Sequence, residues 1–325
     1  MFDLEMDNIE KGQRWAVSRL QDDSAARRLV SDYPVAGAYL LDLRQPPRER
    51  IALLEAALEA ARQLKEYGRE AVHLGNLGLA YAAFGEMRRA IDFYEQALTI
   101  TRKIGDRRGE GRALGNLGFA YYDLGETRRA IDFYEQHLAL ARETGDRRGE
   151  GIALGNLGSA YYDLGESHRA IDFHEQALVI DRETGDQRSE GIDLSNLGIA
   201  YKTLGEPRRA VDCYEQALVI ARRIGDRRGE SIVLGKLGAV YYGLGEPSRA
   251  VESHEQALTI AREIGDRLCE AIALFNLSNA LYQIRQREQA MGLMETALPI
   301  FEQIESPYAA YARETLTKWR NFASE

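Results

Sequence analysis

The chain has 325 residues, of which 45% are hydrophobic and 29% are charged, and its formal net charge is −9. This composition is that of a globular protein, and the acidic balance argues against nucleic acid as a partner, because phosphate binding requires a predominantly basic surface. No apolar stretch is long enough to predict a membrane-spanning helix, and the first residues lack the apolar core of a secretory signal, so we expect no membrane association and a cytoplasmic location.

The N-terminal part of the chain differs from the rest. We expect residues 1–28 to form one or two capping helices, with Trp15 as a packing anchor. Residues 29–65 are predicted to be a degenerate copy of a 40-residue repeat, because their apolar residues precede those of a regular copy by 40 positions, as Ile51 precedes Ile91.

Residues 66–304 are predicted to form six repeats of 40 residues. The motif Leu-Gly-Asn-Leu-Gly stands at 74–78 and returns at 114–118 and 154–158. The sixth copy is less regular, with Arg285 in the place of the turn glycine. A fixed period of this length indicates an array that grows by stacking repeats rather than by enlarging a single core.

Each repeat is predicted to consist of two helices joined by tight turns. Apolar residues recur at helical spacing in both halves, as Leu114, Leu117 and Tyr121 do in the first half. Gly125 suits the left-handed conformation that ends a helix, and Pro207 in a later copy suits the first turn of the next one. Small residues facing large ones would let the two helices interlock.

The chain ends with residues 305–325, which we predict to be a capping helix and a tail. Trp319 should pack inward from this helix. Terminal elements of a repeat array are expected to be atypical because one of their faces meets water.

The repeat resembles the tetratricopeptide repeat from about residue 30 to residue 304. The residues that carry the resemblance in one copy are Leu77, Gly78, Tyr81, Ala90, Tyr94 and Ala97. The usual repeat has about 34 residues, and the longer form seen here is similar to the repeats of Pins/LGN-type polarity adaptors, of kinesin light chains and of bacterial STAND (NB-ARC) ATPases. The resemblance implies an all-α, right-handed solenoid of stacked helix-turn-helix repeats.

The same resemblance implies a non-catalytic scaffold that binds a peptide or a helix of a protein partner in its concave groove. The segment at residues 31–51 is similar to the start of the repeat arm in STAND proteins, where it follows the nucleotide-binding parts. We therefore expect the sensor or regulatory arm of a STAND-type signalling ATPase. The alternative is a free-standing adaptor that forms homo-oligomers through its groove or its ends.

An asparagine recurs on the first helix of most repeats, and the resemblance places it in the groove. The series comprises Asn76, Asn116, Asn156, Asn196 and Asn276, and Lys236 interrupts it. A side-chain amide both donates and accepts hydrogen bonds, which suits the backbone of an extended ligand. Alternatively, each asparagine bonds to its own repeat or to the neighbouring one, and both roles can hold together.

Positions that vary between copies should set the specificity of the groove. The resemblance assigns to the groove Arg112, Phe119, Tyr122, Tyr162, Ile199, Lys202 and Tyr242. A clamp for a C-terminal carboxylate would need Asn or Lys at several of these positions, whereas most are apolar or aromatic. An amphipathic helix or an extended peptide with hydrophobic anchors therefore suits the groove better. The isoleucines four residues before the asparagines can instead seal neighbouring first helices.

No constellation of residues predicts an enzyme, a cofactor or a metal. The glycines around Gly109 follow a helix and lack the lysine of a phosphate-binding loop. His174 and His254 stand where other copies have tyrosine, so we expect core residues with a hydrogen-bond partner rather than metal ligands. Cys213 and Cys269 lie in different repeats and form no metal-binding pair, so we expect them to be small apolar fillers.

Charged residues that recur once per repeat should serve the surface. The glutamates of the second helices are predicted to form a solvated or inter-helix hydrogen-bonding stripe; they are Glu95, Glu135, Glu175, Glu215 and Glu255. Arginine pairs such as Arg128-Arg129 are predicted to form a solvated outer stripe, and the alternative is contact with an acidic partner domain.

Overall fold

The computed structural model describes residues 11–12, 15–20, 23–41 and 47–323. Its helices are α2 (Ser24–Leu41), α3 (Pro47–Leu64), α4 (Tyr67–Ala83), α5 (Met87–Ile104), α6 (Arg107–Asp123), α7 (Thr127–Thr144), α8 (Arg147–Asp163), α9 (Ser167–Thr184), α10 (Gln187–Thr203), α11 (Pro207–Ile224), α12 (Arg227–Gly243), α13 (Pro247–Glu263), α14 (Arg267–Gln283), α15 (Arg287–Gln303) and α16 (Tyr308–Ala323). These described residues contain no β-strand. The prediction of an all-α solenoid is confirmed.

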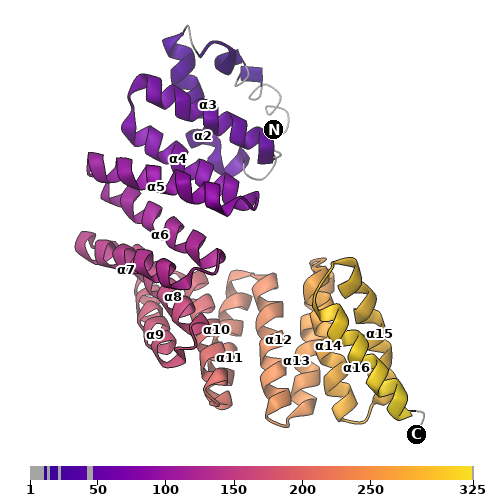
Figure 1. The fold of residues 1–325 in the computed structure, drawn as a ribbon. Helices are drawn as coiled ribbons and strands as arrows, with labels where there is room; N and C mark the ends of the chain where they lie inside the picture. The colour runs from indigo at the N-terminus through magenta and orange to yellow at the C-terminus, as the bar shows by residue number, and fades with distance from the viewer. Residues whose placement is uncertain (1–10, 13–14, 21–22, 42–46, 324–325) are drawn as a thin grey trace. The chain divides into compact units, whose positions relative to one another are not determined.

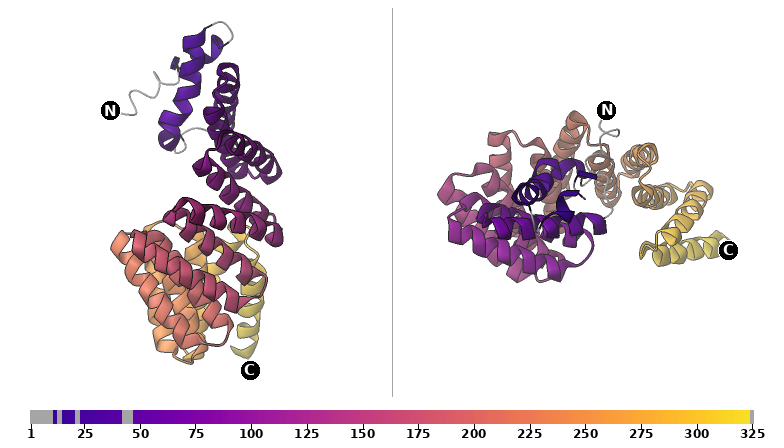
Figure 2. Two further views of the ribbon diagram at one scale, coloured as in Figure 1. Left: turned by 90° about the vertical axis from the view of Figure 1, so that its left-hand side faces the viewer. Right: turned by 90° about the horizontal axis from the view of Figure 1, so that it is seen from above.

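The helices follow one another in two compact units, residues 1–164 and residues 165–325. In the first unit each helix packs against the next from α2 to α8, and in the second unit the same holds from α9 to α16 (Figures 1 and 2). First helices of neighbouring pairs also touch, α4 with α6, α6 with α8 and α12 with α14. The first helices α4, α6 and α8 therefore form a row in the first unit, as α12 and α14 do in the second.

Helix α2 runs across the boundary predicted between residues 28 and 29, because it begins at Ser24. The division of the chain into capping segments, a degenerate repeat and six regular repeats remains a prediction. None of the helices in the described part of the chain is both long enough and apolar enough to cross a bilayer.

The turns have the geometry that the sequence predicts. Gly125 adopts a left-handed conformation with φ 75°, and Pro207 is the first residue of α11. The side chain of Asp146 caps α8 by accepting a hydrogen bond from the amide of Gly149, at 3.0 Å. In the irregular sixth repeat Arg285 keeps the left-handed turn at φ 67°, where a side chain is strained.

Packing within a helix pair depends on a glycine that faces an aromatic ring. A Cβ added to Gly198 of α10 would lie 2.5 Å from Cε1 of Tyr214 in α11, well inside van der Waals contact. The interlocking of small and large residues is therefore confirmed. In the sixth repeat both partners change together: Ser278 replaces the glycine and Met294 replaces the aromatic residue, with 3.9 Å between Oγ and Sδ.

We expect Gly198→Ser to lower the free energy of unfolding by ~1–3 kcal/mol, because the added atoms overpack the core. Tyr214→Met should restore part of this loss in the Gly198→Ser background, since the pair then matches Ser278 and Met294. Urea unfolding of the four proteins of this double-mutant cycle measures the coupling. A coupling energy near zero would show that the glycine and the ring do not constrain each other.

Arginine–glutamate clamps join successive repeats. Nε of Arg222, at the end of α11, lies 2.8 Å from Glu230 of α12, and the Arg227 guanidinium lies 2.5 Å from the other oxygen of the same carboxylate. Arg222 also donates to Gln256 of α13 at 3.1 Å. The first of these pairs recurs as Arg62–Glu70, Arg102–Glu110, Arg142–Glu150, Arg182–Glu190 and Arg262–Glu270. The repeat pattern in the sequence alone does not predict these clamps.

Among the five recurring glutamates of the second helices, Glu95, Glu175 and Glu215 accept an inter-helix hydrogen bond from a tyrosine hydroxyl. Tyr241 of α12 donates to Glu215 of α11 at 2.9 Å, and the Arg249 guanidinium lies over the Tyr241 ring at 3.9 Å. The equivalent Arg129 and Arg209 lie in the same way over Tyr121 and Tyr201. These arginines thus lie over a tyrosine of the first helix while more than half of each side chain stays exposed, as the prediction of a solvated stripe requires.

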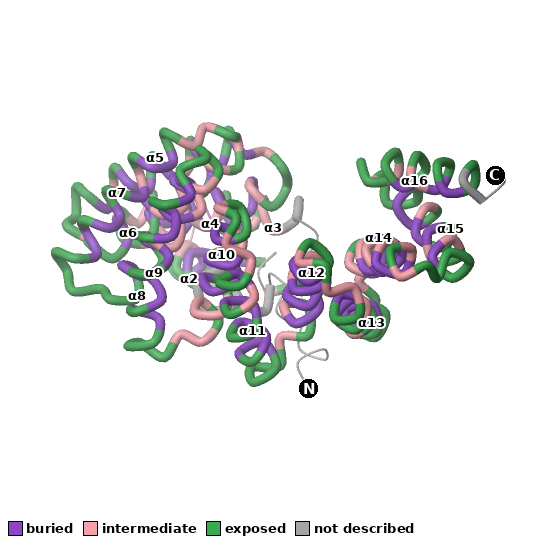
Figure 3. The backbone as a smooth tube through the Cα atoms, turned by 90° about the horizontal axis from the view of Figure 1, so that it is seen from below, coloured by how far each residue is buried: buried purple, intermediate pink, exposed green. Residues whose placement is uncertain are grey.

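The two tryptophans differ. Trp319 of α16 is buried and stacks on Tyr282 with ring centroids 4.2 Å apart, as predicted. Trp15 is 47% exposed, so its predicted role as a packing anchor is wrong. Its small neighbour Ala16 is buried instead, together with Leu20. Figure 3 shows that buried backbone follows the facing sides of the helices, whereas the turns are exposed.

Candidate functional site

The asparagine series lies on the first helices α4, α6, α8, α10 and α14. All five side chains are half-buried. None of the five amides takes part in a hydrogen bond with any part of the chain that the structure describes. An amide that is only partly solvated and has no partner in the chain is available to the backbone of a ligand.

The other predicted groove residues divide by exposure. Phe119 is 54% exposed and Tyr242 is 39% exposed, although both are aromatic. Arg112 and Lys202 are exposed, whereas Tyr122, Tyr162 and Ile199 are half-buried. Exposed aromatic side chains on a stable scaffold are typical anchors for a protein partner.

Tyr122 of α6 is less available to a partner than Phe119 and Tyr242 are, because its hydroxyl already has a partner within the chain. Its hydroxyl donates a hydrogen bond to the carboxylate of Asp163 in α8. Burial, followed by this bond to Asp163, raises the pKa of Tyr122 to about 12. Tyr122 thus links two first helices of the first unit, and its hydroxyl is already used.

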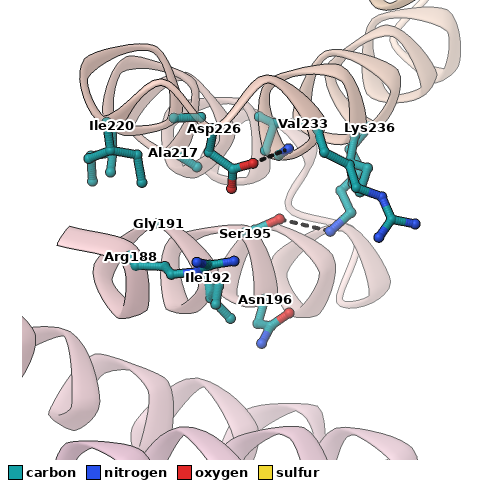
Figure 4. A pocket seen from close by; sticks show the side chains of 15 residues that line it. Arg188, Gly191, Ile192, Ser195, Asn196, Ala217, Ile220, Asp226, Val233 and Lys236 are labelled. Atoms are coloured by element: carbon teal, nitrogen blue, oxygen red, sulfur yellow. Dashed lines mark hydrogen bonds between the residues drawn. The ribbon is translucent and has the colours of Figure 1, made fainter. Parts of the chain in front are cut away.

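Each unit has a pocket between two neighbouring first helices. In the first unit a cavity of about 190 Å³ lies between α4 and α6, and Asn76, Asn116 and Arg112 are among its lining residues. In the second unit a cavity of about 290 Å³ lies between α10 and α12, with Asn196 and Lys236 in its wall (Figure 4). Four of the predicted site residues therefore lie in these two pockets.

Between α6 and α8, the place that corresponds to the two pockets is occupied by the side chain of His137 of α7. Its imidazole lies against Gly111 and Gly115 of α6 and against Gly149 of α8. The corresponding residues of α5 and α11 are Ala97 and Ala217, which line the two pockets. The size of this one side chain of the second helix thus controls the space between two first helices.

Lys236 is a site residue that the sequence analysis named only as an interruption of the asparagine series. Its Nζ lies 2.7 Å from Oγ of Ser195 in α10. Burial lowers the pKa of Lys236 below its ordinary value. The departure from asparagine in a single copy was the signal that could have identified it.

The two histidines in the core behave differently. His174 of α9 is buried, and its Nδ1 lies 2.7 Å from Oδ1 of Asp193 in α10, as the prediction of a hydrogen-bond partner requires. His254 of α13 is also buried, but its Nδ1 has no partner among the described residues, so the prediction is wrong for this residue. Burial lowers the pKa of His254 to about 4.

The two cysteines of the chain are free thiols, Cys213 buried and Cys269 half-buried. Burial raises the pKa of Cys213 and that of Cys269 to about 11, which makes both thiols poor nucleophiles at neutral pH. Within the described ranges no group of three or more His, Cys, Asp or Glu residues could hold a metal ion.

Comparisons with known proteins agree with this architecture. The sequence model of the tetratricopeptide repeat matches residues 49–103, 109–183, 149–223, 192–263 and 229–303. None of the curated proteins compared with the chain matches it.

Several solved structures have the same fold. The STAND protein with a tetratricopeptide repeat sensor from Pyrococcus horikoshii has a TM-score of 0.69 and 17% identity, over 98% of this chain and 47% of its own. The repeats of a putative kinesin light chain from Podospora anserina have a TM-score of 0.52 and 22% identity, over 60% of this chain and 95% of their own. A Rap protein complexed with Competence and Sporulation Factor has a TM-score of 0.56 and 14% identity, over 98% of this chain and 99% of its own. At these identities the likeness shows the fold alone.

Proposed function

The chain belongs to the tetratricopeptide repeat family, and from this premise we propose that it binds a peptide or a helix of a protein partner along the first helices of its repeats. The family implies a scaffold for protein–protein interaction. The observation that carries the finer proposal is the asparagine series, whose half-buried amides have no partner in the described chain. Because the repeats hold these groups at fixed positions before binding, the receptor loses little conformational entropy on binding.

Exposed apolar residues on the same helices support this proposal. Besides Phe119 and Tyr242, the side chains of Leu79, Ile152 and Ile192 are between 45% and 55% exposed. About half of each of these isoleucine side chains is thus left exposed to a ligand. Apolar anchors beside free amides suit a ligand that offers both a backbone and hydrophobic side chains.

We further propose that the chain is the sensor or regulatory arm of a STAND-type signalling ATPase. The likeness to the STAND protein of P. horikoshii supports this, since 98% of this chain aligns with 47% of that one. An upstream reading frame that encodes a nucleotide-binding domain would support this assignment. An upstream gene of unrelated function would favour a free-standing adaptor.

The adaptor alternative includes self-association through exposed residues of the first helices or of the ends. Light scattering at several concentrations distinguishes a chain of 36.5 kDa from a homo-oligomer. A molar mass that rises with concentration in the wild type but stays at the monomer value in Phe119→Ala would support self-association through the exposed residues of the first helices.

Affinity capture from native lysate tests the binding proposal. The bait is the wild-type chain beside an Asn116→Ala/Asn156→Ala variant, which removes two free amides from α6 and α8. A matched control, Arg88→Ala/Arg128→Ala, removes two exposed side chains from the second helices α5 and α7. All baits must have equal helicity.

We expect a partner that the wild type and the arginine variant retain and that the asparagine variant loses. A partner retained by the asparagine variant but lost by the arginine variant would move the site to the second helices. The asparagines would then have no role in recognition.

A further inference from the structure

The pocket between α10 and α12 differs from the rest of the asparagine-lined surface. Its wall contains aliphatic side chains, among them Ile192, Ile220 and Val233, and basic side chains that come from both helices. Figure 4 shows Lys236 extending from α12 toward α10, where it meets Ser195. The pocket thus combines an apolar surface with an ammonium group.

Lys236 stands where the other regular copies have asparagine. Its ammonium has three N–H donors, and one of them is used by Oγ of Ser195. The centroid of the Tyr214 ring lies 6.0 Å from Nζ. No carboxylate of the described chain lies within ion-pair distance of Lys236.

A cation without a counterion is costly where water is partly excluded. Burial already lowers the pKa of Lys236, so the protein weakens its own charged state at this position. A carboxylate brought by a ligand would supply the missing counterion and accept the remaining donors. The interaction would be strong because binding removes the remaining water from both charges.

Most of the charged residues that line the pocket have the same sign as Lys236. Arg188 at the start of α10 and Arg228 at the start of α12 also line it. Nε of Arg228 is paired with Asp266 at 3.0 Å. The one acidic lining residue, Asp226, uses an oxygen to cap α12 through the amide of Gly229, at 2.9 Å. The pocket is therefore basic, although the chain as a whole is acidic.

We propose that this pocket takes an aspartate or glutamate side chain of an extended partner peptide, with its carboxylate on Lys236 and a neighbouring aliphatic side chain against the isoleucines. This inference rests on the proposed function and specifies the ligand for one part of the binding face. A single ammonium beside aliphatic side chains suits one acidic side chain with an aliphatic neighbour.

The test is selection of a displayed library of random peptides on the full chain, followed by affinity measurements on synthetic copies of the selected peptides. Lys236→Asn is the variant, because asparagine is the residue that other copies carry at this position and should fold there. Arg223→Ala is the control, since it removes one exposed positive charge of α11 outside the pocket.

We expect the selected peptides to share an acidic residue next to an aliphatic one and to bind Lys236→Asn at least about tenfold more weakly. The affinity for Arg223→Ala should stay within about twofold. Replacement of the shared acid by its amide should cause the same loss on the wild type and no further loss on Lys236→Asn.

Three results would overturn the inference. If the selected peptides lack a shared acid, or bind Lys236→Asn equally well, the pocket assignment fails while the binding function of the chain stands. If amidation of the peptide C-terminus abolishes binding, the ligand group is the terminal carboxylate and not a side chain. If no peptide is enriched, both this inference and the proposed peptide binding fail.

Discussion

Replacing Leu117 with alanine is expected to lower the free energy of unfolding by ~2–5 kcal/mol. Leu117 of α6 is fully buried. Its removal leaves a cavity that neighbouring helices, held by their own contacts, fill only in part. Phe119 lies two residues away on the same helix and is 54% exposed, so it is a matched control of larger size.

Phe119→Ala should change the free energy of unfolding by no more than ~0.5 kcal/mol, as is usual for an exposed site. It should nevertheless weaken binding of the partner. Urea unfolding followed by circular dichroism measures both variants. If Phe119→Ala destabilised the chain as much as Leu117→Ala, Phe119 would belong to the core and not to the binding face.

Asp181→Ala is expected to stabilise the protein at about pH 8. Asp181 of α9 is buried, and one of its carboxyl oxygens has no hydrogen-bond partner in the described chain. Equivalent positions in α7, α11 and α13 carry the alanines Ala141, Ala221 and Ala261, so the variant should pack well. Burial, and then the neighbouring carboxyl of Asp193, raise the pKa of Asp181 from 3.8 to about 8.

The sign of the pH dependence follows from this shift. The folded state binds the proton of Asp181 more tightly than the unfolded state does. The stability that protonated Asp181 contributes is fully present below pH 3.8 and is lost as the pH rises toward about 8. Each pH unit in this window removes at most about 1.4 kcal/mol from the free energy of unfolding.

Comparison of the wild type with Asp181→Ala measures how the interaction of Asp181 with its surroundings, including the carboxyl of Asp193, depends on pH. Chemical unfolding at about pH 5 and pH 8 should show that the advantage of the variant grows with pH. Three buried histidines, His73, His137 and His254, have lowered pKa values, so their protonation on acidification lowers the free energy of unfolding. This effect is the same in both proteins and cancels in the difference between them. An advantage that stayed constant across this range would mean that Asp181 is ionised in the folded protein throughout.

Helices and turns could be predicted because their signals are local. The left-handed glycine at 125, the proline at 207 and the apolar spacing around Leu117 each restrict the backbone or the buried face on their own. Each signal recurs in several repeats, so the helices and turns of one irregular repeat can be predicted from the others. Even Arg285, without the freedom of glycine, adopts the left-handed turn that the rest of its repeat requires.

Contacts between repeats could not be predicted in the same way. Arg222 and Glu230 are near in sequence, but their pairing depends on how α11 meets α12. The stacking of Arg249 on Tyr241 likewise needs the angle between two helices. Trp15 was misjudged because its size suggested burial, whereas the adjacent small residue Ala16 meets the core.

The candidate site could be predicted at the level of the helix face only. The asparagine series and Phe119 follow from the repeat pattern, but the absence of bonds to the amides is a property of packed neighbours. Lys236 shows the difference most clearly. Its unusual place was visible in the sequence, but its contact with Ser195 and the pocket beside it were not.

Hydroxyl-radical footprinting of the complex with the captured partner tests the binding face most directly. The method reports the solvent access of exposed aromatic side chains. We expect the partner to protect Phe119 or Tyr242 on the first helices and to leave Tyr311 of α16, which is 60% exposed, unchanged. Protection of Tyr311 with no change at Phe119 and Tyr242 would contradict binding along the first helices and place the partner at the C-terminal end of the array.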